Sequence, residues 1–281
     1  MSFFKGNNFS FDLGKKTYVM GILNITPDSF FDGGKWNSLD KAINHAIEMQ
    51  NDGADIIDIG AQSTRPNHIE LSEQDELDII KKYINPISKA VNIPISIDTF
   101  YPQVAEYCIL NGATIINDVS GIFNPKMAEI VKRYNAGWIF MHTGGGDATK
   151  VINYTDGVVK NVLDFFDDIE NQAVEFGISK EQLCFDMGIG FGKSNDDNIE
   201  LIRNIKRLKS NNRGLLTALS CKRVIKNATL AEGSDLKYGT LAADTIAIMG
   251  GTDFIRVHHT KEAVLAAKMA DVIIRNGAYN G

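Results

Sequence analysis

Short apolar runs rich in isoleucine and valine recur along the chain, and segments with helical periodicity separate them. The runs lie at 18–24, 55–60, 94–98, 114–119, 137–142, 183–188, 215–220 and 253–258. Near-continuous apolar runs of this length are typical of parallel strands that are covered on both faces. The pattern therefore predicts eight parallel strands with helices between them.

The intervening segments repeat apolar residues at helical spacing. The segment 38–53 is a clear example, because Ser38 is a candidate N-cap and Gly53 is a candidate stop signal. Further helices are predicted at 77–91, 101–112, 124–135, 158–177, 198–210, 238–251 and 260–277.

Eight strand–helix units in 281 residues give about 35 residues per unit, which predicts a (β/α)₈ barrel. A doubly wound open sheet is the competing architecture, but no GxGxxG follows the first strand and a count of eight favours closure. We expect residues 9–19 to form a small hairpin at the bottom of the barrel. No linker or block of charge divides the chain, so we expect one domain over 1–281.

Composition and charge exclude several classes of function. A net charge of −6 and a pI near 5.4 give no electrostatic basis for binding nucleic acid. No apolar run reaches the roughly 18 residues that a membrane span needs, and the N-terminus lacks the pattern of a signal peptide. Three widely spaced cysteines, Cys108, Cys184 and Cys221, argue against a disulfide framework. We therefore expect a cytoplasmic protein that contacts neither membranes nor nucleic acid.

Polar side chains stand where the predicted strands end. They are Asn24, Gln62, Thr64, Arg65, Asp98, Asn117, Asp118, His142, Asp186, Ser220, Lys222, Arg256 and His258, and the apolar Met141 stands beside His142. In a parallel barrel these positions converge on one rim, where such barrels carry their chemistry. An aspartate after a strand is often the N-cap of the next helix, but Asp98 and Asp186 lie several residues before any predicted helix.

These residue types indicate two adjoining subsites. The carboxylates of Asp98 and Asp186 and the amide of Asn117 can match the N–H donors at the edge of a heterocycle, and Lys222 can donate to the same ring. Arg65, Arg256, His258 and Asn24 suit a phosphorylated group, because arginine forms bidentate contacts with phosphate. We expect a deep, flat, polar pocket with an anion site at its mouth.

The motifs that carry these residues resemble those of the dihydropteroate synthase family. They are MGILNITPDSFFDGG (20–34), DIGAQSTRPN (58–67), ISIDTF (95–100), INDVSG (116–121), MH (141–142), FDMGIGFGK (185–193), LSCK (219–222) and RVH (256–258). They follow the order and spacing of the family from about residue 17 to 275. The resemblance implies a homodimeric, pterin-binding (β/α)₈ barrel. It also implies a transferase that joins 4-aminobenzoate to 6-hydroxymethyl-7,8-dihydropterin diphosphate, giving 7,8-dihydropteroate and pyrophosphate in folate biosynthesis with the help of Mg²⁺.

The resemblance also implies residue roles. Asp98, Asp186, Lys222 and Arg256 would be catalytic. The pterin would contact Asp98, Asn117, Met141, Asp186, Lys222 and Arg256. The diphosphate would contact Asn24, acting through magnesium, together with Thr64, Arg65, Arg256 and His258. The 4-aminobenzoate would lie among Phe30, Thr64, Pro66, Phe191 and Ser220. The segment 25–34 would then be a lid that bends at Gly33 and Gly34.

Two positions depart from the family pattern. Cys221 stands where the family usually has arginine, and Arg223 is a candidate for replacing that charge. Gln62 stands where the family more often has glutamate. The cysteine leaves one alternative, a pterin-binding paralogue with lost or altered activity. A second alternative is a methyltransferase with a similar pterin-binding barrel, which passes the methyl group of methyltetrahydrofolate to a corrinoid partner.

Overall fold

Eight parallel strands form a closed barrel in the order β10-β3-β4-β5-β6-β7-β8-β9, so the predicted fold is confirmed. The computed structural model describes residues 2–25, 38–62, 71–144, 150–209 and 213–275. The strands are β3 (Tyr18–Asn24), β4 (Ile56–Gly60), β5 (Ile95–Asp98), β6 (Ile115–Asp118), β7 (Gly137–Met141), β8 (Leu183–Asp186), β9 (Gly214–Thr217) and β10 (Phe254–Val257). Each overlaps one predicted apolar run.

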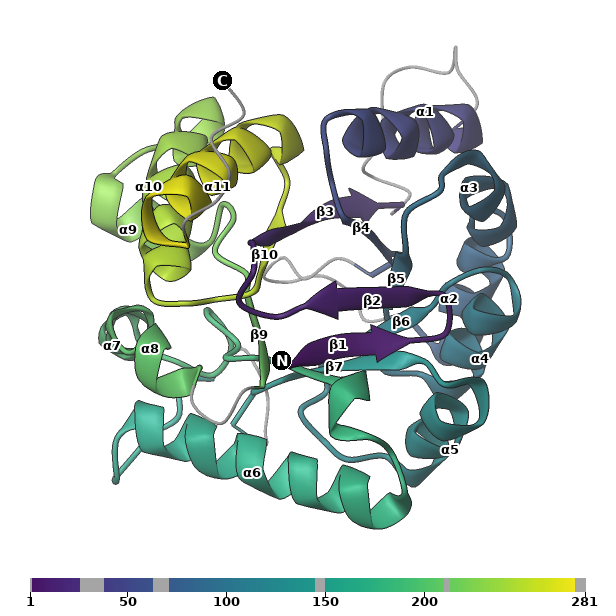
Figure 1. Ribbon diagram of the computed structural model, residues 1–281, viewed down its shortest axis with the longest axis horizontal. Helices are drawn as coiled ribbons and strands as arrows, with labels where there is room; N and C mark the ends of the chain where they lie inside the picture. Colours follow the sequence, from purple (N-terminus) through teal and green to yellow (C-terminus); the bar gives the residue numbers. More distant parts are fainter. Residues whose placement is uncertain (1, 26–37, 63–70, 145–149, 210–212, 276–281) are drawn as a thin grey trace.

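Helices surround the barrel (Figure 1). They are α1 (Ser38–Asn51), α2 (Glu73–Ile80), α3 (Ile84–Ala90), α4 (Pro102–Leu110), α5 (Pro125–Tyr134), α6 (Val158–Phe176), α7 (Asn195–Arg203), α8 (Ile205–Leu208), α9 (Arg223–Thr229), α10 (Leu236–Met249) and α11 (Thr260–Ile274). Short 3₁₀ turns lie at η2 (Lys180–Gln182) and η4 (Gly233–Asp235).

The predicted single helices at 77–91 and 198–210 are each two helices. In the first case α2 ends at Ile80 and α3 begins at Ile84, which places Pro86 in the first turn of α3. Proline is tolerated there because the first backbone N–H groups of a helix have no partner within it. Helix α9 was not predicted, because its seven residues carry only a short apolar stripe.

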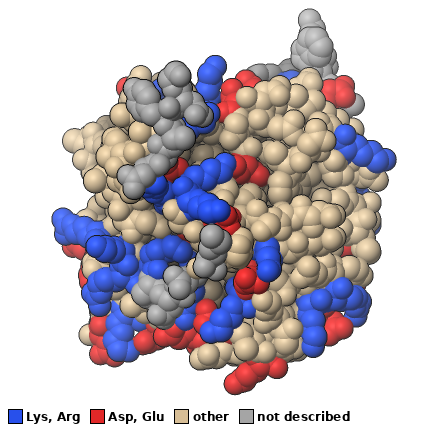
Figure 2. Space-filling model, in the orientation of Figure 1, with Lys and Arg blue, Asp and Glu red and all other residues tan. Residues whose placement is uncertain are grey.

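A hairpin closes one end of the barrel, but the prediction placed it too late in the chain. Strand β1 (Phe3–Gly6) pairs with β2 (Phe9–Asp12), whereas Tyr18 begins the first barrel strand. The ring of Phe4 lies 5.6 Å from that of Phe254, between ring centroids, and the ring of Phe11 lies 4.7 Å from that of Tyr18. In Figure 1 the hairpin crosses the end that faces the viewer, and acidic and basic side chains are intermingled on this face in Figure 2.

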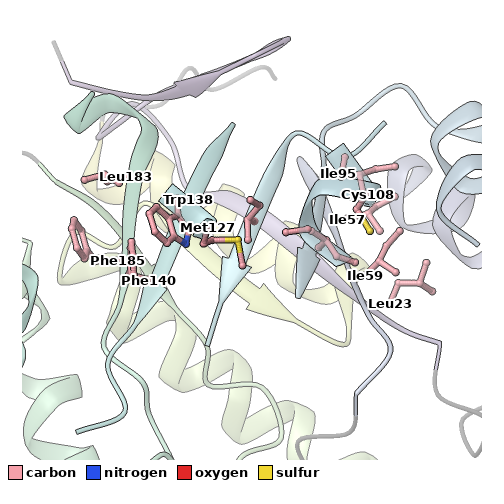
Figure 3. Close-up of a cluster of buried hydrophobic side chains, with 14 of the residues drawn as sticks. Leu23, Ile57, Ile59, Ile95, Cys108, Met127, Trp138, Phe140, Leu183 and Phe185 are labelled. Carbon is pink, nitrogen blue, oxygen red and sulfur yellow. The ribbon is translucent and has the colours of Figure 1, made fainter. Parts of the chain in front are cut away.

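Alternation along each strand divides the core into two layers. Outward residues such as Ile57, Trp138 and Phe185 pack between the strands and the helices, as Figure 3 shows. Inward residues near the hairpin, such as Ile139 and Leu216, fill the lower part of the barrel. The inward positions at the opposite end carry the polar residues, so the site lies where parallel strands end. Within the described residues no helix is long and apolar enough to cross a membrane.

Candidate active site

Strand register brings several of the predicted residues into one layer at the mouth of the barrel. Asn24 pairs with Gly60, Gly60 with Asp98, and Asp98 with Asn117 across three neighbouring strand pairs. Because Gly60 has no side chain, Asn24 and Asp98 face each other across an open position. The register therefore confirms that these strand ends converge.

Arg256 reaches across the mouth to two carboxylates. From β10 its Nε donates to Asp58 Oδ2 on β4 at 2.6 Å, and its Nη2 donates to Asp98 Oδ2 on β5 at 2.7 Å. Strand β3 lies between β10 and β4, so the side chain spans the barrel interior rather than the gap between neighbouring strands. Burial alone would lower the pKa of Arg256, but Asp58 and Asp98 more than reverse this, so the guanidinium stays charged.

On the opposite side of the mouth, Asp186 and Lys222 are the main charged groups. Asp186 ends β8 beside Met141 of β7, and its Oδ1 accepts from the backbone N–H of Gly188 at 2.8 Å. Lys222 Nζ donates to the carbonyl of Ile189 at 2.6 Å and lies 5.0 Å from the ring centroid of Phe191. The turn that follows β8 thus holds the lysine and its aromatic neighbour together.

Burial shifts the pKa values of three of these groups toward the neutral range. Desolvation raises the pKa of Asp98 to about 7, although Arg256 opposes the rise. Desolvation likewise raises the pKa of Asp186, with Lys222 acting against it. The pKa of Lys222 falls to about 8 because burial outweighs the attraction of Asp186. Carboxylates and an ammonium group with such pKa values are typical of functional sites.

The turn after β9 carries Ser220, Cys221 and Lys222. Ser220 Oγ lies 2.9 Å from His258 Nδ1, which joins the ends of β9 and β10. Cys221 adopts a left-handed conformation with φ of 57°, and its N–H donates to Thr240 Oγ1 at 3.2 Å. Arg223, the candidate for replacing the charge that the family has at position 221, begins α9 and is exposed.

Two predicted rim residues point away from the barrel interior, which corrects the sequence interpretation. Asp118 Oδ2 accepts from Trp138 Nε1 at 3.3 Å, and Trp138 belongs to the outer core layer. His142 Nε2 lies 2.8 Å from Asn161 Oδ1 on α6, and its ring packs edge-on against Phe165. Each follows an inward-facing residue, so side-chain alternation turns it outward.

Two buried site residues were missed. Asp58 lies inside the apolar run 55–60, where a central aspartate in a buried strand was the available signal. Lys193 Nζ donates to the carbonyls of His142, Gly188 and Phe191 at 3.0, 3.0 and 2.9 Å and so ties the end of β7 to the turn after β8. Desolvation lowers its pKa to about 7.

Four predicted ligand contacts, Phe30, Thr64, Arg65 and Pro66, lie outside the described residues, as do Gly33 and Gly34. Gln62 is described, and its Nε2 donates to Glu76 Oε2 at 2.5 Å. Glu76 is fully buried, and desolvation raises its pKa. The amide at position 62 therefore supplies a donor to this carboxylate, which a glutamate there could supply only when protonated.

The donor chemistry at the mouth is compatible with Mg²⁺. A Cβ atom added to Gly60 would lie 3.8 Å from Asn24 Oδ1 and 3.6 Å from Asp98 Oδ2, so two oxygen donors flank the same open position. Mg²⁺ prefers oxygen ligands and usually takes the rest of its shell from water and substrate phosphates. Among the described residues no group of three or more His, Cys, Asp or Glu side chains could hold a metal alone.

Comparison with known proteins identifies the family. The model of the pterin binding enzyme family matches residues 20–258. A dihydropteroate synthase from Clostridium beijerinckii is 40% identical over 267 residues, which cover 94% of this chain and 97% of that protein. The chain belongs to the dihydropteroate synthase family.

Solved structures of this family have the same fold. A Clostridium difficile dihydropteroate synthase, crystallised in the presence of pteroic acid, is 41% identical with a TM-score of 0.88, covering 94% of this chain and 99% of that one. A Xanthomonas albilineans dihydropteroate synthase with 4-aminobenzoic acid is 34% identical with a TM-score of 0.86, covering 92% and 94%.

Family membership makes the chain a transferase of folate biosynthesis, as predicted. The comparisons favour the synthase over both alternatives, the inactive paralogue and the corrinoid-linked methyltransferase.

Proposed function

We propose that the mouth of the barrel binds 6-hydroxymethyl-7,8-dihydropterin diphosphate and 4-aminobenzoate and joins them to give 7,8-dihydropteroate and pyrophosphate. The observation that carries this assignment of roles is the convergence of Asp98, Asn117 and Asp186 with Lys222 at one end of the barrel. Three oxygen acceptors and one ammonium donor match a flat ring that has several N–H groups and one carbonyl.

The pterin is proposed to lie against the inward side chains of β5 to β8. Asp98, Asn117 and Asp186 accept its N–H groups, and Lys222 donates to a ring acceptor. Met141 ends β7 beside Asp186, is 2% exposed and supplies an apolar surface for one face of the ring. Arg256 lies over the other face, where its planar guanidinium stacks on an aromatic system.

The diphosphate is proposed to lie at the rim near Asn24, Arg256 and His258. His258 is exposed, and its ring contacts Ser220 at the end of β9. Thr64 and Arg65 complete this set in the proposal and lie outside the described residues. When bound through Asn24, magnesium would neutralise part of the charge on the leaving diphosphate.

The transfer breaks the bond between the pterin CH₂ group and the diphosphate oxygen, which keeps the electron pair. Positive charge then spreads into the electron-rich dihydropterin, and the nearby carboxylates of Asp98 and Asp186 stabilise it. The amine of 4-aminobenzoate forms the new C–N bond and loses a proton to solvent. Phe191 and Ser220 wall the arylamine in this proposal, together with Phe30, Thr64 and Pro66.

Substitutions at the two main charged groups test the pterin site. Asp186→Asn and Lys222→Met each remove one charged hydrogen bond, which is worth about 1.5–3 kcal/mol, so affinity for 6-hydroxymethyl-7,8-dihydropterin falls by about tenfold or more. Calorimetric titration measures this. Asp118→Asn is the matched control, because this carboxylate is equally buried but faces outward to Trp138. Unchanged affinity in both site variants would refute the assignment.

We also propose that the chain acts in the cytoplasm as a homodimer of single-domain subunits spanning 1–281. Free Cys108, Cys184 and Cys221 are consistent with a reducing compartment. Helices α10 and α11 lie side by side and carry apolar side chains that are each more than half exposed: Ile246, Met249, Leu265, Met269 and Ile273. Exposed apolar side chains gathered on two neighbouring helices are typical of an interface between subunits, and a second copy of the chain would cover them.

A further inference from the structure

One carboxylate oxygen holds two of the proposed pterin ligands at once. Asp58 Oδ2 accepts from Arg256 Nε at 2.6 Å and from Asn117 Nδ2 at 3.0 Å. Asp58 is fully buried on β4, whereas its partners come from β10 and β6. It pairs with Ser96 of β5 in the register, two residues and therefore one inward-facing layer below Asp98.

The contact with Asp58 fixes which way round the Asn117 side chain lies. A carboxylate accepts hydrogen bonds and cannot donate them, so the amide nitrogen of Asn117 must face Asp58. The carbonyl oxygen of Asn117 therefore points away from Asp58. Among the described residues no other hydrogen bond of this side chain is formed, which leaves that oxygen as an acceptor for a ligand.

The same contact holds Arg256 in place independently of Asp98. The guanidinium has one bond to each aspartate, through Nε to Asp58 and through Nη2 to Asp98. Asp98 is itself a proposed pterin ligand, so its bond to Arg256 competes with the bond to the substrate. The bond to Asp58 does not compete, because Asp58 lies deeper in the barrel than the ligand layer.

We propose that Asp58 is a positioning residue of the synthase reaction, which orients Asn117 as an acceptor and anchors Arg256 while Asp98 exchanges that arginine for the pterin. The inference rests on the proposed function of the site. Asp58 does not touch the substrate; it acts through two residues that do. It therefore influences pterin binding rather than the binding of 4-aminobenzoate.

Two substitutions of similar volume separate the effects of charge and of hydrogen bonding. Asp58→Leu removes every acceptor, so Asn117 is free to turn and Arg256 stays on Asp98. Asp58→Asn keeps one oxygen that can accept from both partners but removes the charge. We expect the KM for the pterin diphosphate to rise at least tenfold in Asp58→Leu and by less in Asp58→Asn, with the KM for 4-aminobenzoate within twofold of the native value in both.

A double-mutant cycle distinguishes positioning from general damage to the fold. We expect Asn117→Ala to weaken binding of 6-hydroxymethyl-7,8-dihydropterin in an otherwise native chain and to have a clearly smaller effect in the Asp58→Leu background, because Asn117 has already lost the contact that orients it there. Asp118→Asn is the matched control, since Asp118 is a buried carboxylate that directly follows Asn117 on β6 and whose partners lie on the outward side. We expect this control to retain native pterin affinity even where it lowers the melting temperature.

The outcomes separate this inference from the proposed function. Native pterin affinity in Asp58→Leu and Asp58→Asn, or strictly additive effects with Asn117→Ala, would overturn the role of Asp58 and leave the synthase assignment intact. Failure of the native chain to bind the pterin would instead overturn the proposed function. If Asp58→Leu does not fold, the same cycle with Asp58→Ala, which also removes both acceptor oxygens, decides the question.

Discussion

Asp98 and Lys222 are charged side chains at the mouth of the barrel whose pKa values bracket a narrow range near neutral pH. Burial raises the pKa of Asp98 to about 7 and lowers that of Lys222 to about 8. The proposed pterin site needs an ionised Asp98 to accept an N–H group and a protonated Lys222 to donate. Both conditions hold together only between these two pKa values.

Pterin binding should therefore depend on pH in a bell-shaped manner. As the pH rises through about 7 Asp98 loses its proton and affinity increases, and above about 8 Lys222 loses its proton and affinity falls. Calorimetric titration with 6-hydroxymethyl-7,8-dihydropterin, which has no diphosphate to titrate, measures the profile. Lys222→Arg is the control, because it stays charged and should remove the alkaline limb alone. A flat profile between pH 6 and 9 would contradict this account.

For single residues at the strand ends, the sequence correctly predicts those whose side chains face the barrel interior and misplaces those whose side chains face the helices. Asn24, Asp98, Asn117 and Asp186 end predicted strands and do converge. Asp118 and His142 also end predicted strands, but they face the helices, and a run of apolar letters does not state which of two adjacent positions faces inward. Asp58 was missed because its role depends on Arg256, which is 198 residues away in the chain.

The hairpin of β1 and β2 is the element whose contribution to stability is easiest to isolate. Its Phe4 is fully buried against Phe254 at the end of the barrel opposite the site. The sequence predicted a hairpin in this region, but the apolar run of the first barrel strand could not be separated from it by periodicity alone. Periodicity alone also could not reveal the break between α2 and α3, where Pro86 fits the first turn of a new helix.

Phe4→Ala should lower the free energy of unfolding by about 3–5 kcal/mol, because it removes a buried aromatic ring and leaves a cavity. The KM for each substrate should stay within twofold of the native value, since the hairpin closes the opposite end of the barrel. Urea unfolding and initial-rate kinetics measure the two quantities. Phe3→Ala is the control, because Phe3 is only partly buried on the same strand and should cost clearly less. Equal costs for the two variants would contradict the proposed role of Phe4.

Because the barrel is closed, it has no free strand edge with which a second subunit could pair. The outer faces of the helices are therefore the surfaces through which subunits can associate. On α11 the residues Leu265, Met269 and Ile273 recur at intervals of four, which forms one apolar stripe. The closed barrel was predictable from eight repeated units, and the stripe could be recognised as exposed only after the packing of α10 against α11 was known.

Leu265→Glu combined with Met269→Glu should convert the proposed dimer to a monomer, because each subunit would bring two carboxylates into the buried, symmetric interface. Light scattering after size-exclusion chromatography measures the mass. Leu110→Glu is the control, since this exposed leucine lies on α4 and away from the stripe. A native chain that is already monomeric, or a double variant that stays dimeric, would contradict the proposed interface.

Initial rates of pyrophosphate and 7,8-dihydropteroate formation test directly whether the chain is a synthase. The reaction contains the pterin diphosphate, 4-aminobenzoate and Mg²⁺, with Cys221→Arg measured beside the native chain. We expect the native chain to release one pyrophosphate for each dihydropteroate formed, with no release when 4-aminobenzoate or Mg²⁺ is omitted. If neither chain forms product while pterin still binds, or if only Cys221→Arg forms product, the proposed synthase activity of the native chain is wrong.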